Sequence, residues 1–526
     1  MVSRRAFLQH ATRLGTLAAL AHAFPGFAAE RSSAYPFTLG VASGSPKPNS
    51  VVIWTRLLPD VLNAGALPAV PYKVRWEVAQ DAGFRQIVTH GFCMALPELA
   101  HSVHVDVIGL QPDRWYWYRF MLGDAVSAVA RTRTAPALDA MPEELKLAVA
   151  SCQHWEYGEY AAHRHIADAN PDLVAFLGDY IYERGPYDLK HPVKPRLHEF
   201  ESYTLADYRR RYAQYKSDAH LQAAHHVAPW ILTWDDHEVS NDYANDQDER
   251  LDVNFLERRA AAYQAFYEHM PVRLFPSGEA TPFAHMRIYE RYDWGRLARF
   301  HVLDDRQYRS HQACPKPGRG GSRSVTDAEC HERQDTTRTM LGQAQEKWLA
   351  RGLANSVARW NVLTQQTFMA QASQTPLVQA AEARFWTDGW DGYPAARQRL
   401  FDDLQKSRAA NPLVISGDVH TFYAADLQRN FYQPASPNNP VLATEFCGTS
   451  VTSTSRPQER TDRYVALNPH IKYGRSDQRG LMLMRLSPTL TETQFLALDD
   501  VSRADSGIRT LCRFVVEDGH PGVQLA

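Results

Sequence analysis

Four hydrophobic runs of this chain each end at side chains that can bind metal ions. The runs are LAVASC, LVAFLGDYIY, ILTWDDHEVSN and LVISGDVHT. A short apolar run closed by polar residues is typical of a strand buried inside a layered sheet. Because the ends of rigid strands can converge on one point, metal and phosphate chemistry is usually assembled there. The side chains at these ends are those of Cys152, Asp179, Tyr182, Asp235, Asp236, His237, Asn241, Asp418 and His420.

Each of these features has an ordinary explanation when it is taken alone. A single Asp at the end of a strand is more often a helix cap or a turn residue than a ligand. A single buried Cys usually packs as a small hydrophobic side chain. Four strand ends that all carry oxygen, nitrogen or sulfur donors are much harder to explain in this way. Together they predict a metal site where the four segments meet.

The length of 526 residues predicts more than one hydrophobic core, because single cores stop growing at about 250–300 residues. Residues 30–137 are predicted to form an N-terminal all-β sandwich of the fibronectin type III or immunoglobulin-like kind. The evidence is a series of short segments, SVVIWTRL, YKVRWEVAQD, SVHVDVIGL and WYWYRFML, with turn signals between them. A tyrosine in the last segment is expected to fix a corner of the sandwich through a bond from its hydroxyl to the backbone.

Residues 138–526 form the second predicted region, and the Pro-rich stretch at residues 130–145 is interpreted as the linker before it. Strands then alternate with helices, which are expected at residues 160–169, 203–226, 254–269 and 341–354. The segment after residue 500 is expected to be a strand rather than a lid helix. This order predicts an α/β domain of layered β-sheets flanked by helices.

Residues 1–29 are predicted to be a cleaved export signal rather than part of the fold. The segment SRRAFL has the twin-arginine pattern, an apolar stretch follows at residues 14–27, and small-x-small sites lie within and just after it. A permanent membrane anchor is the alternative, but the stretch is short and contains His22 and Pro25. We therefore expect the twin-arginine export machinery as a partner, a periplasmic or secreted location, and no stable membrane span.

The charge balance argues against one class of partner. The formal net charge is −2, and loss of the signal-peptide residues Arg4, Arg5 and Arg13 would take it to about −5. A protein that binds nucleic acid is expected to carry a basic surface instead. We therefore expect no nucleic-acid partner.

Six cysteines are present, and in an oxidising compartment some of them are expected to pair. Cys314 and Cys330 flank a Gly-rich loop and are the favoured pair, although connectivity does not follow from sequence alone. Cys152 is expected to remain unbridged, because a metal-binding cysteine must stay a thiolate.

One set of candidate donors is suited to a transition metal. Cys152, Tyr182 and His420 would supply a thiolate, a phenolate and an imidazole. Thiolate and phenolate together favour an acidic ion such as Fe³⁺. These three residues therefore predict an iron site.

A second set supplies only oxygen. It consists of Asp236, Asp418 and, through its amide carbonyl, Asn241. All-oxygen sites suit Ca²⁺, Mg²⁺ or Mn²⁺. Asp179 has two carboxylate oxygens and lies three residues before Tyr182, so it is predicted to bridge the two metals.

At this point the chain resembles a known family. The motifs CQ, FLGDYIYE, WDDHEVSNDY, LDDRQYRS, ISGDVHT and NPHIKYGRSDQRG are similar, in this order, to those of PhoD-type alkaline phosphatases/phosphodiesterases. That family belongs to the calcineurin-like metallophosphoesterases and is distantly related to the purple acid phosphatases. The resemblance spans roughly residues 35–500 and implies a metallophosphoesterase fold for the second region.

The resemblance implies the same division of ligands, with one Fe³⁺ beside Ca²⁺ and with Mn²⁺ or Mg²⁺ as alternatives for the second metal. Iron would be held by Cys152, Asp179, Tyr182 and His420. Calcium would be held by Asp179, Asp236, Asn241 and Asp418.

Two further residues are candidates for catalytic roles. The DDHE segment aligns with a GNHE segment of related phosphoesterases, which places His237 where a histidine contacts substrate or orients a ligand carboxylate. Arg306 in LDDRQYRS is a candidate phosphate clamp, because a guanidinium matches phosphate geometry. A structural ion pair between Arg306 and Asp304 or Asp305 is the alternative.

The residues and the family resemblance together predict an exported hydrolase of small phosphomonoesters and phosphodiesters that uses a metal-activated hydroxide. A phospholipase D-like diesterase acting on lipid head groups is the alternative within enzymes, although no amphipathic aromatic stripe supports a membrane surface. A wall-binding or adhesion protein with a degenerate site is the alternative of another class. Its signature would be missing ligands, and here every motif position is filled.

Overall fold

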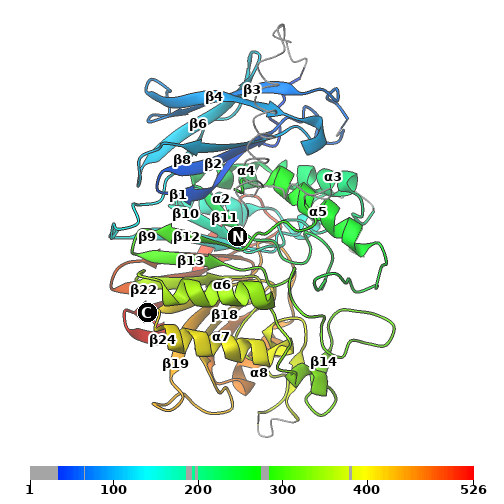
Figure 1. Ribbon diagram of the computed structural model, residues 1–526, viewed down its shortest axis with the longest axis vertical. Coiled ribbons are helices and arrows are strands. Elements are labelled where there is room, and N and C mark those ends of the chain that lie inside the picture. Colours follow the sequence, from blue (N-terminus) through cyan, green and yellow to red (C-terminus); the bar gives the residue numbers. More distant parts are fainter. Residues whose placement is uncertain (1–33, 64, 185–191, 196–199, 274–282, 378–381) are drawn as a thin grey trace, which may run out of the picture.

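A computed structural model describes residues 34–63, 65–184, 192–195, 200–273, 283–377 and 382–526 (Figure 1). The export signal predicted at residues 1–29 lies outside them.

The largest sheet within the described residues has ten strands. In spatial order they are β24 (His520–Leu525), β23 (Ile508–Glu517), β22 (Leu490–Leu498), β21 (Gly480–Leu486), β9 (Leu145–Ala150), β10 (Leu173–Phe176), β11 (Trp230–Leu232), β1 (Val41–Lys47), β2 (Ser50–Arg56) and β5 (Ser102–Ile108). The central strands β9, β10 and β11 are parallel neighbours. Their near-continuous apolar sequences fit this position, because parallel strands are buried on both faces.

A second sheet of seven strands packs against the first. In spatial order it contains β12 (Glu290–Trp294), β13 (Ala298–Val302), β15 (Trp360–Thr364), β17 (Pro412–Ser416), β19 (Val441–Cys447), β18 (Phe422–Gln428) and β20 (Ile471–Arg475). Val149 and Ala175 of the first sheet share a buried core with Val362 and Ile415 of the second. The two sheets therefore lie face to face, with β17 on the opposite side of this core from β9 and β10.

Helices cover the outer faces of both sheets (Figure 1). The first sheet is covered by α2 (Ala161–Ala169), α3 (Leu205–Lys216), α4 (Ala219–Val227) and α5 (Phe255–His269), and the second by α6 (Gly342–Ala354) and α7 (Pro394–Ser407). A further helix, α8 (Gln458–Leu467), contacts β20. The result is a four-layer arrangement in which the strand ends meet between two rigid sheets.

Three of the four helices expected from sequence are confirmed as α2, α5 and α6, but the single helix expected at residues 203–226 is wrong. The structure has two helices there, because Asp218 caps the second of them. The Asp218 carboxylate accepts hydrogen bonds from the backbone N–H groups of His220 and Leu221. A capped helix start of this kind interrupts an otherwise continuous helical pattern.

The strands of the N-terminal region divide between two sheets. β1, β2 and β5 extend the ten-stranded sheet, and β1 pairs in parallel with β11 through Gly44 and Trp230. The other strands form a five-stranded sheet of β3 (Tyr72–Ala79), β4 (Ile87–Ala95), β6 (Trp115–Leu122), β7 (Ala125–Val126) and β8 (Ala130–Arg133). Val51 and Val103 of the large sheet share a core with Val74 of the five-stranded sheet.

Two sequence expectations for this region can be compared with the structure. The expected tyrosine corner is confirmed, because the Tyr116 hydroxyl accepts a hydrogen bond of 2.9 Å from the Gln111 backbone N–H. The linker expected from residue 130 is wrong at its start. Residues 130–133 form β8, which pairs with β6, and their alternation buries Ala130 and Thr132.

The favoured cysteine pair is confirmed by a disulfide between Cys314 and Cys330. Cys152 is free and buried, as expected. β23 and β24 confirm that the segment after residue 500 forms strands.

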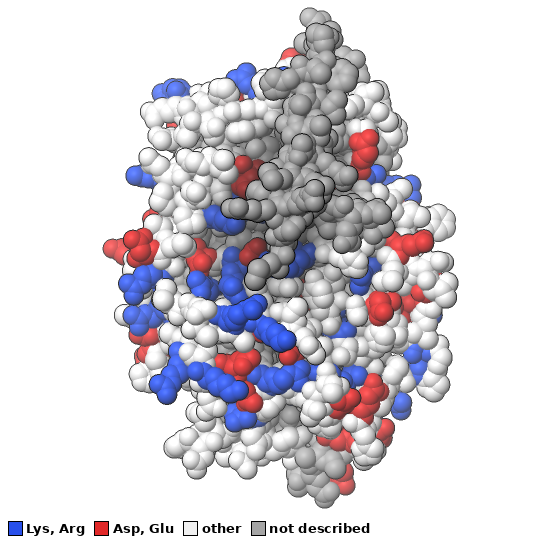
Figure 2. Space-filling model, viewed as in Figure 1, with Lys and Arg blue, Asp and Glu red and all other residues white. Residues whose placement is uncertain are grey.

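Charged side chains of both signs are mixed on the face shown in Figure 2, where Lys and Arg gather over the lower half with Asp and Glu among them. Arg399 of α7 pairs with Glu346 of α6, and Arg299 pairs with Asp293 between β13 and β12. In the described part of the chain, no helix is both long and apolar enough to cross a membrane.

Candidate metal centre

The four segments singled out in the sequence meet at one place in the fold. Cys152 follows β9, Asp179 follows β10 and Asp236 follows β11, and these three strands are adjacent and parallel. Asp418 and His420 follow β17 of the facing sheet. Because parallel strands point their carboxyl ends toward the same edge, the side chains converge between the sheets.

The backbone at this place is held in an uncommon conformation. Cys152, Asp179, Asp418 and His420 have φ angles of 59°, 55°, 62° and 53°. A non-glycine residue with positive φ is uncommon, and such residues cluster at functional sites where the surrounding structure fixes them. The surrounding structure therefore holds four candidate ligands in a strained backbone conformation, which fixes the orientation of their side chains.

Gly178 brings two of the ligand-bearing loops close together. It has a φ of 102°, and a Cβ at this position would lie 2.5 Å from both Cβ and N of Asp235. Only glycine combines this backbone conformation with such a close approach. The spacing between the Asp179 loop and the Asp235 loop therefore depends on the missing side chain.

We expect Gly178→Ala to destabilise the protein by about 2 kcal/mol or more and to lower its activity. Left-handed backbone costs an L-residue about 1–2 kcal/mol, and the collision with Asp235 adds an overpacking cost. Gly109→Ala is the matched control, because Gly109 also has positive φ, at 80°, but has no atom within 4 Å of a Cβ. Urea unfolding and phosphatase assays should show the larger loss in Gly178→Ala. Equal stability losses and full activity in both variants would contradict this account of the loop spacing.

The sulfur, phenol and imidazole groups predicted to bind iron lie together. Donor atoms of Cys152, Asp179 and His420 all lie within 4.8 Å of one another. The Tyr182 hydroxyl lies 2.7 Å from Oδ2 of Asp179 and 3.2 Å from Nε2 of His420. His420 Nδ1 contacts the carbonyl of Thr454 at 2.6 Å, which leaves Nε2 facing the cluster. This donor set fits a transition metal, and the Thr454 contact is the kind of support that orients a histidine ligand.

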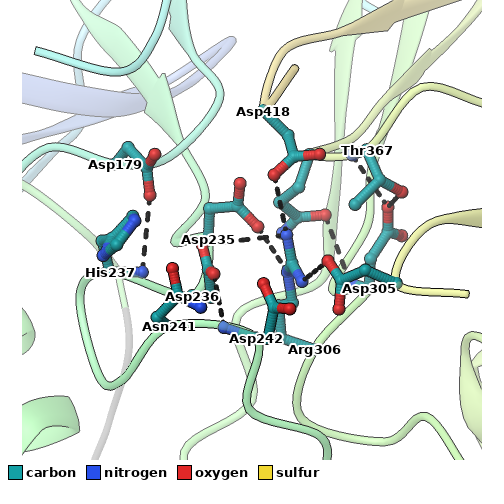
Figure 3. Close-up of polar contacts among 12 residues, drawn as sticks. Asp179, Asp235, Asp236, His237, Asn241, Asp242, Asp305, Arg306, Thr367 and Asp418 are labelled. Atoms are coloured by element: carbon teal, nitrogen blue, oxygen red, sulfur yellow. Dashed lines mark hydrogen bonds and ion pairs between the residues drawn. The ribbon is translucent and has the colours of Figure 1, made fainter. Parts of the chain in front are cut away.

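The oxygen donors form an adjoining group (Figure 3). Carboxylate oxygens of Asp179 and Asp236 lie within 4.8 Å of each other and of a ring nitrogen of His237. Carboxylate oxygens of Asp235, Asp236 and Asp418 also lie within 4.8 Å of one another. Oδ2 of Asp235 is buried without a hydrogen-bond partner among the described residues. Asp179 belongs to both the sulfur-containing and the oxygen group. These carboxylates fit a second, hard cation beside the first.

His237 is buried against a glutamate that the sequence reasoning missed. Its Nδ1 lies 2.7 Å from Oε2 of Glu183, and the other oxygen of Glu183 accepts a hydrogen bond from the Asn241 backbone N–H. Burial by itself would lower the pKa of His237, but the carboxylates of Glu183, Asp236 and Asp179 together raise it well above its usual value. The carboxylates around His237 therefore favour its protonated form at the edge of the oxygen group.

Arg306 lies between the acidic side chains, with an exposed fraction of 0%. Its Nε lies 2.5 Å from Asp235 and its Nη2 lies 3.1 Å from Asp418 (Figure 3). Its Nη1 lies 2.6 Å from Asp388. The alternative pairing with Asp304 or Asp305 is not observed for the guanidinium. All three donor nitrogens of Arg306 are thus engaged by carboxylates.

Many acidic groups lie close together in the centre, and the pKa values of several of them are raised. Burial, with Asp179 next to it, raises the pKa of both Cys152 and Tyr182 well above their usual values. Burial also raises the pKa of Asp418, although Arg306 opposes the rise. A cation among such groups stabilises their ionised forms and reverses shifts of this kind. The electrostatics of the donor set therefore fit bound metal ions.

A second acidic residue, Glu238, ties the loops together. Its carboxylate accepts hydrogen bonds from the backbone N–H groups of Asp179, Tyr180 and Asp235 at 2.6–3.0 Å. Burial raises its pKa to about 8, although these N–H groups oppose the rise. Glu183 and Glu238 could have been found in the sequence, since each directly follows a motif residue. Asp388 could not, because it lies in a loop without a motif.

Comparisons with known proteins identify the family to which this chain belongs. The PhoD-like phosphatase family model matches residues 147–495, and the model of the PhoD-like phosphatase N-terminal domain matches residues 20–136. Alkaline phosphatase D of Bacillus subtilis (strain 168) is 42% identical over 540 residues, which covers 99% of this chain and 88% of that protein. A solved structure of PhoD matches with a TM-score of 0.87 at 42% identity, and the match covers 95% of this chain and 93% of that one. The resemblance found in the sequence is confirmed: the chain belongs to the PhoD-like phosphatase family, and it is a phosphatase.

Proposed function

We propose that this phosphatase is an exported, metal-dependent hydrolase of phosphomonoesters and phosphodiesters. The observation that carries the proposal is the pair of adjoining donor groups that share Asp179. A thiol, a phenol and an imidazole lie on one side of that carboxylate, and carboxylates lie on the other. The twin-arginine pattern in residues 1–29 supports export.

Two metals fit the two donor groups. Cys152, Asp179, Tyr182 and His420 would hold Fe³⁺, and Asp179, Asp236, Asn241 and Asp418 would hold Ca²⁺, with Mn²⁺ or Mg²⁺ as alternatives. When bound, two such cations would activate water and offset the charge on the phosphoryl oxygens. No protein nucleophile is required.

The remaining polar residues have supporting roles in this proposal. His237, whose protonated form is favoured by Glu183, is placed to donate a proton or hydrogen bond to a phosphoryl or leaving oxygen. Arg306 holds Asp235 and Asp418 in place through its three engaged nitrogens. We therefore propose that Arg306 positions carboxylates, in place of the direct phosphate contact expected from sequence.

The experiment is a comparison of p-nitrophenyl phosphate with bis(p-nitrophenyl) phosphate, each with and without a calcium chelator. We expect hydrolysis of both substrates, loss of both activities on chelation, and recovery when calcium is restored. Hydrolysis only of phospholipid diesters would favour the lipid alternative. Unchanged turnover after complete removal of calcium would contradict the second metal.

We expect Cys152→Ser to lose iron and any visible thiolate-to-iron absorption. A serine hydroxyl does not ionise near neutral pH, so it is a much poorer ligand than a thiolate. Cys447→Ser is the matched control, because Cys447 is equally buried and free but does not belong to either donor group. Iron content and the visible spectrum of both folded variants would be measured. An unchanged spectrum and iron content in Cys152→Ser would show that Cys152 is structural.

A further inference from the structure

A cavity of about 490 Å³ opens directly beside the candidate metal centre. Asp418 and His420 belong to both, so one end of the cavity is the centre itself. The volume lies in the range that holds a small organic molecule. A phosphoester whose phosphoryl group lies at the centre can therefore place its organic substituent in this cavity.

One part of the cavity wall is aromatic. Phe368 and Tyr423 are buried with ring centroids 4.9 Å apart, and Trp386 and Tyr464 line the cavity with them. Trp386, at the end of β16 (Arg384–Trp386), is 48% exposed, which is unusual for a side chain of this size. An exposed indole at the edge of a cavity offers a flat face to a planar group.

Another part of the wall carries positive charges that are not paired with acidic groups. Arg456 and Arg460 both line the cavity, and their guanidinium carbons lie 5.1 and 6.0 Å from the Tyr464 ring centroid. Within the described part of the chain, neither side chain makes a hydrogen bond or an ion pair. By contrast, Arg306 and Arg309 near the centre are both paired with carboxylates.

Three of the four acidic side chains of the same wall are paired with arginines: Asp388, Asp391 and, through Arg306, Asp418. The fourth, Asp242, accepts a hydrogen bond from Ser322. Asp391 is paired with Arg397 at 2.8 Å, and Asp388 is paired with Arg306 and Arg309. Among the described residues that line the cavity, Arg456 and Arg460 are therefore arginines without an acidic partner. Arginine is suited to bind a phosphate or a carboxylate with two parallel hydrogen bonds.

We infer that this cavity binds the organic substituent of the phosphoester and favours substituents with a planar ring and a second negative charge, as nucleoside diphosphates have. The ring would stack on Trp386, and the second anion would bind Arg456 and Arg460. The inference rests on the proposed phosphoesterase function and adds a substrate class to it.

The test uses two aryl monoesters that differ by one charge. 3-Carboxyphenyl phosphate carries a carboxylate, and 3-carbamoylphenyl phosphate has a neutral amide of similar size. Glycerol 2-phosphate has no ring. Phosphate release would be measured for the metal-loaded enzyme, for Trp386→Ala and for Arg456→Gln/Arg460→Gln. Arg463→Gln is the control, because Arg463 is exposed on α8 but does not line the cavity.

We expect the unmodified enzyme to prefer the carboxylate ester to the amide by about tenfold in kcat/KM, as one charge-assisted hydrogen bond contributes. The double arginine variant should bring this ratio close to one, and Arg463→Gln should leave it unchanged. Trp386→Ala should lower kcat/KM for both aryl esters and not for glycerol 2-phosphate.

The two proposals fail in different ways. Absence of phosphate release from all three esters by the unmodified enzyme would overturn the proposed function and this inference with it. Normal turnover with the same charge preference in the unmodified enzyme and the double variant would overturn only the inference.

Discussion

Asp179→Asn is expected to lower phosphatase activity by more than about 100-fold, because changes to supporting residues alone typically cost about 10–100-fold. Asp179 is the residue shared by the sulfur-containing and the oxygen donor groups. Asparagine has nearly the same size and also tolerates left-handed backbone, so the φ of 55° at this position can be kept. The variant removes the negative charge that would hold two cations close together. The binding of both metals should therefore be weakened or lost.

The comparison variants are Asp236→Asn and Asn241→Ala, which each affect only the oxygen group. Asp248→Asn is the control for a buried carboxylate outside the centre, since among the described residues Asp248 accepts hydrogen bonds only from nearby backbone N–H groups. Activity and metal content would be measured with circular dichroism as a test of folding. A folded Asp179→Asn protein with both metals and near-normal turnover would show that the centre is misplaced.

Arg306→Gln is expected to be the most destabilising of the single substitutions, at about 3–5 kcal/mol. The guanidinium is fully buried, and its loss would leave Asp235, Asp388 and Asp418 without their common partner. Buried charges that lose their partner are strongly destabilising, since they are desolvated without compensation. Arg306→Lys should recover only part of the stability, because an ammonium cannot reproduce three fixed donor directions.

The control is Arg399→Gln on the surface, where the pair with Glu346 is partly exposed and should contribute only about 0–1 kcal/mol. Free energies of unfolding would be measured in urea with all variants in the same buffer. A loss in Arg306→Gln no larger than that in Arg399→Gln would contradict the positioning role.

The sequence predicted the core of the candidate site because the information was local. Each ligand-bearing segment is a buried strand followed by its donors, as with β10 and Asp179, so period and residue type were sufficient. The disulfide between Cys314 and Cys330 was favoured over other pairings because the two cysteines flank one short Gly-rich loop, although only the structure establishes the pairing. Helices with a continuous apolar face, such as α5, could be predicted from the sequence in the same way.

Other features depend on contacts between distant segments, and local patterns do not encode these. Nothing in the sequence near Gly44 shows that β1 pairs with β11. The structure shows that the pairing brings the two strands so close that a Cβ at Gly44 would lie 2.7 Å from the Trp230 carbonyl oxygen. The partners of Arg306 are separated from it by up to 112 residues. The pairing with Asp388 in particular joins the segment after β13 to the segment after β16, and no motif marks it.

The central claim is that two different metals share Asp179, and elemental analysis of the active protein tests it most directly. Iron and calcium per chain would be measured across preparations of different specific activity. We expect about one iron and at least one calcium, Mn²⁺ or Mg²⁺ ion per chain in the most active fractions, with activity rising in proportion to both. Full activity in protein that contains neither iron nor a second metal would contradict the account.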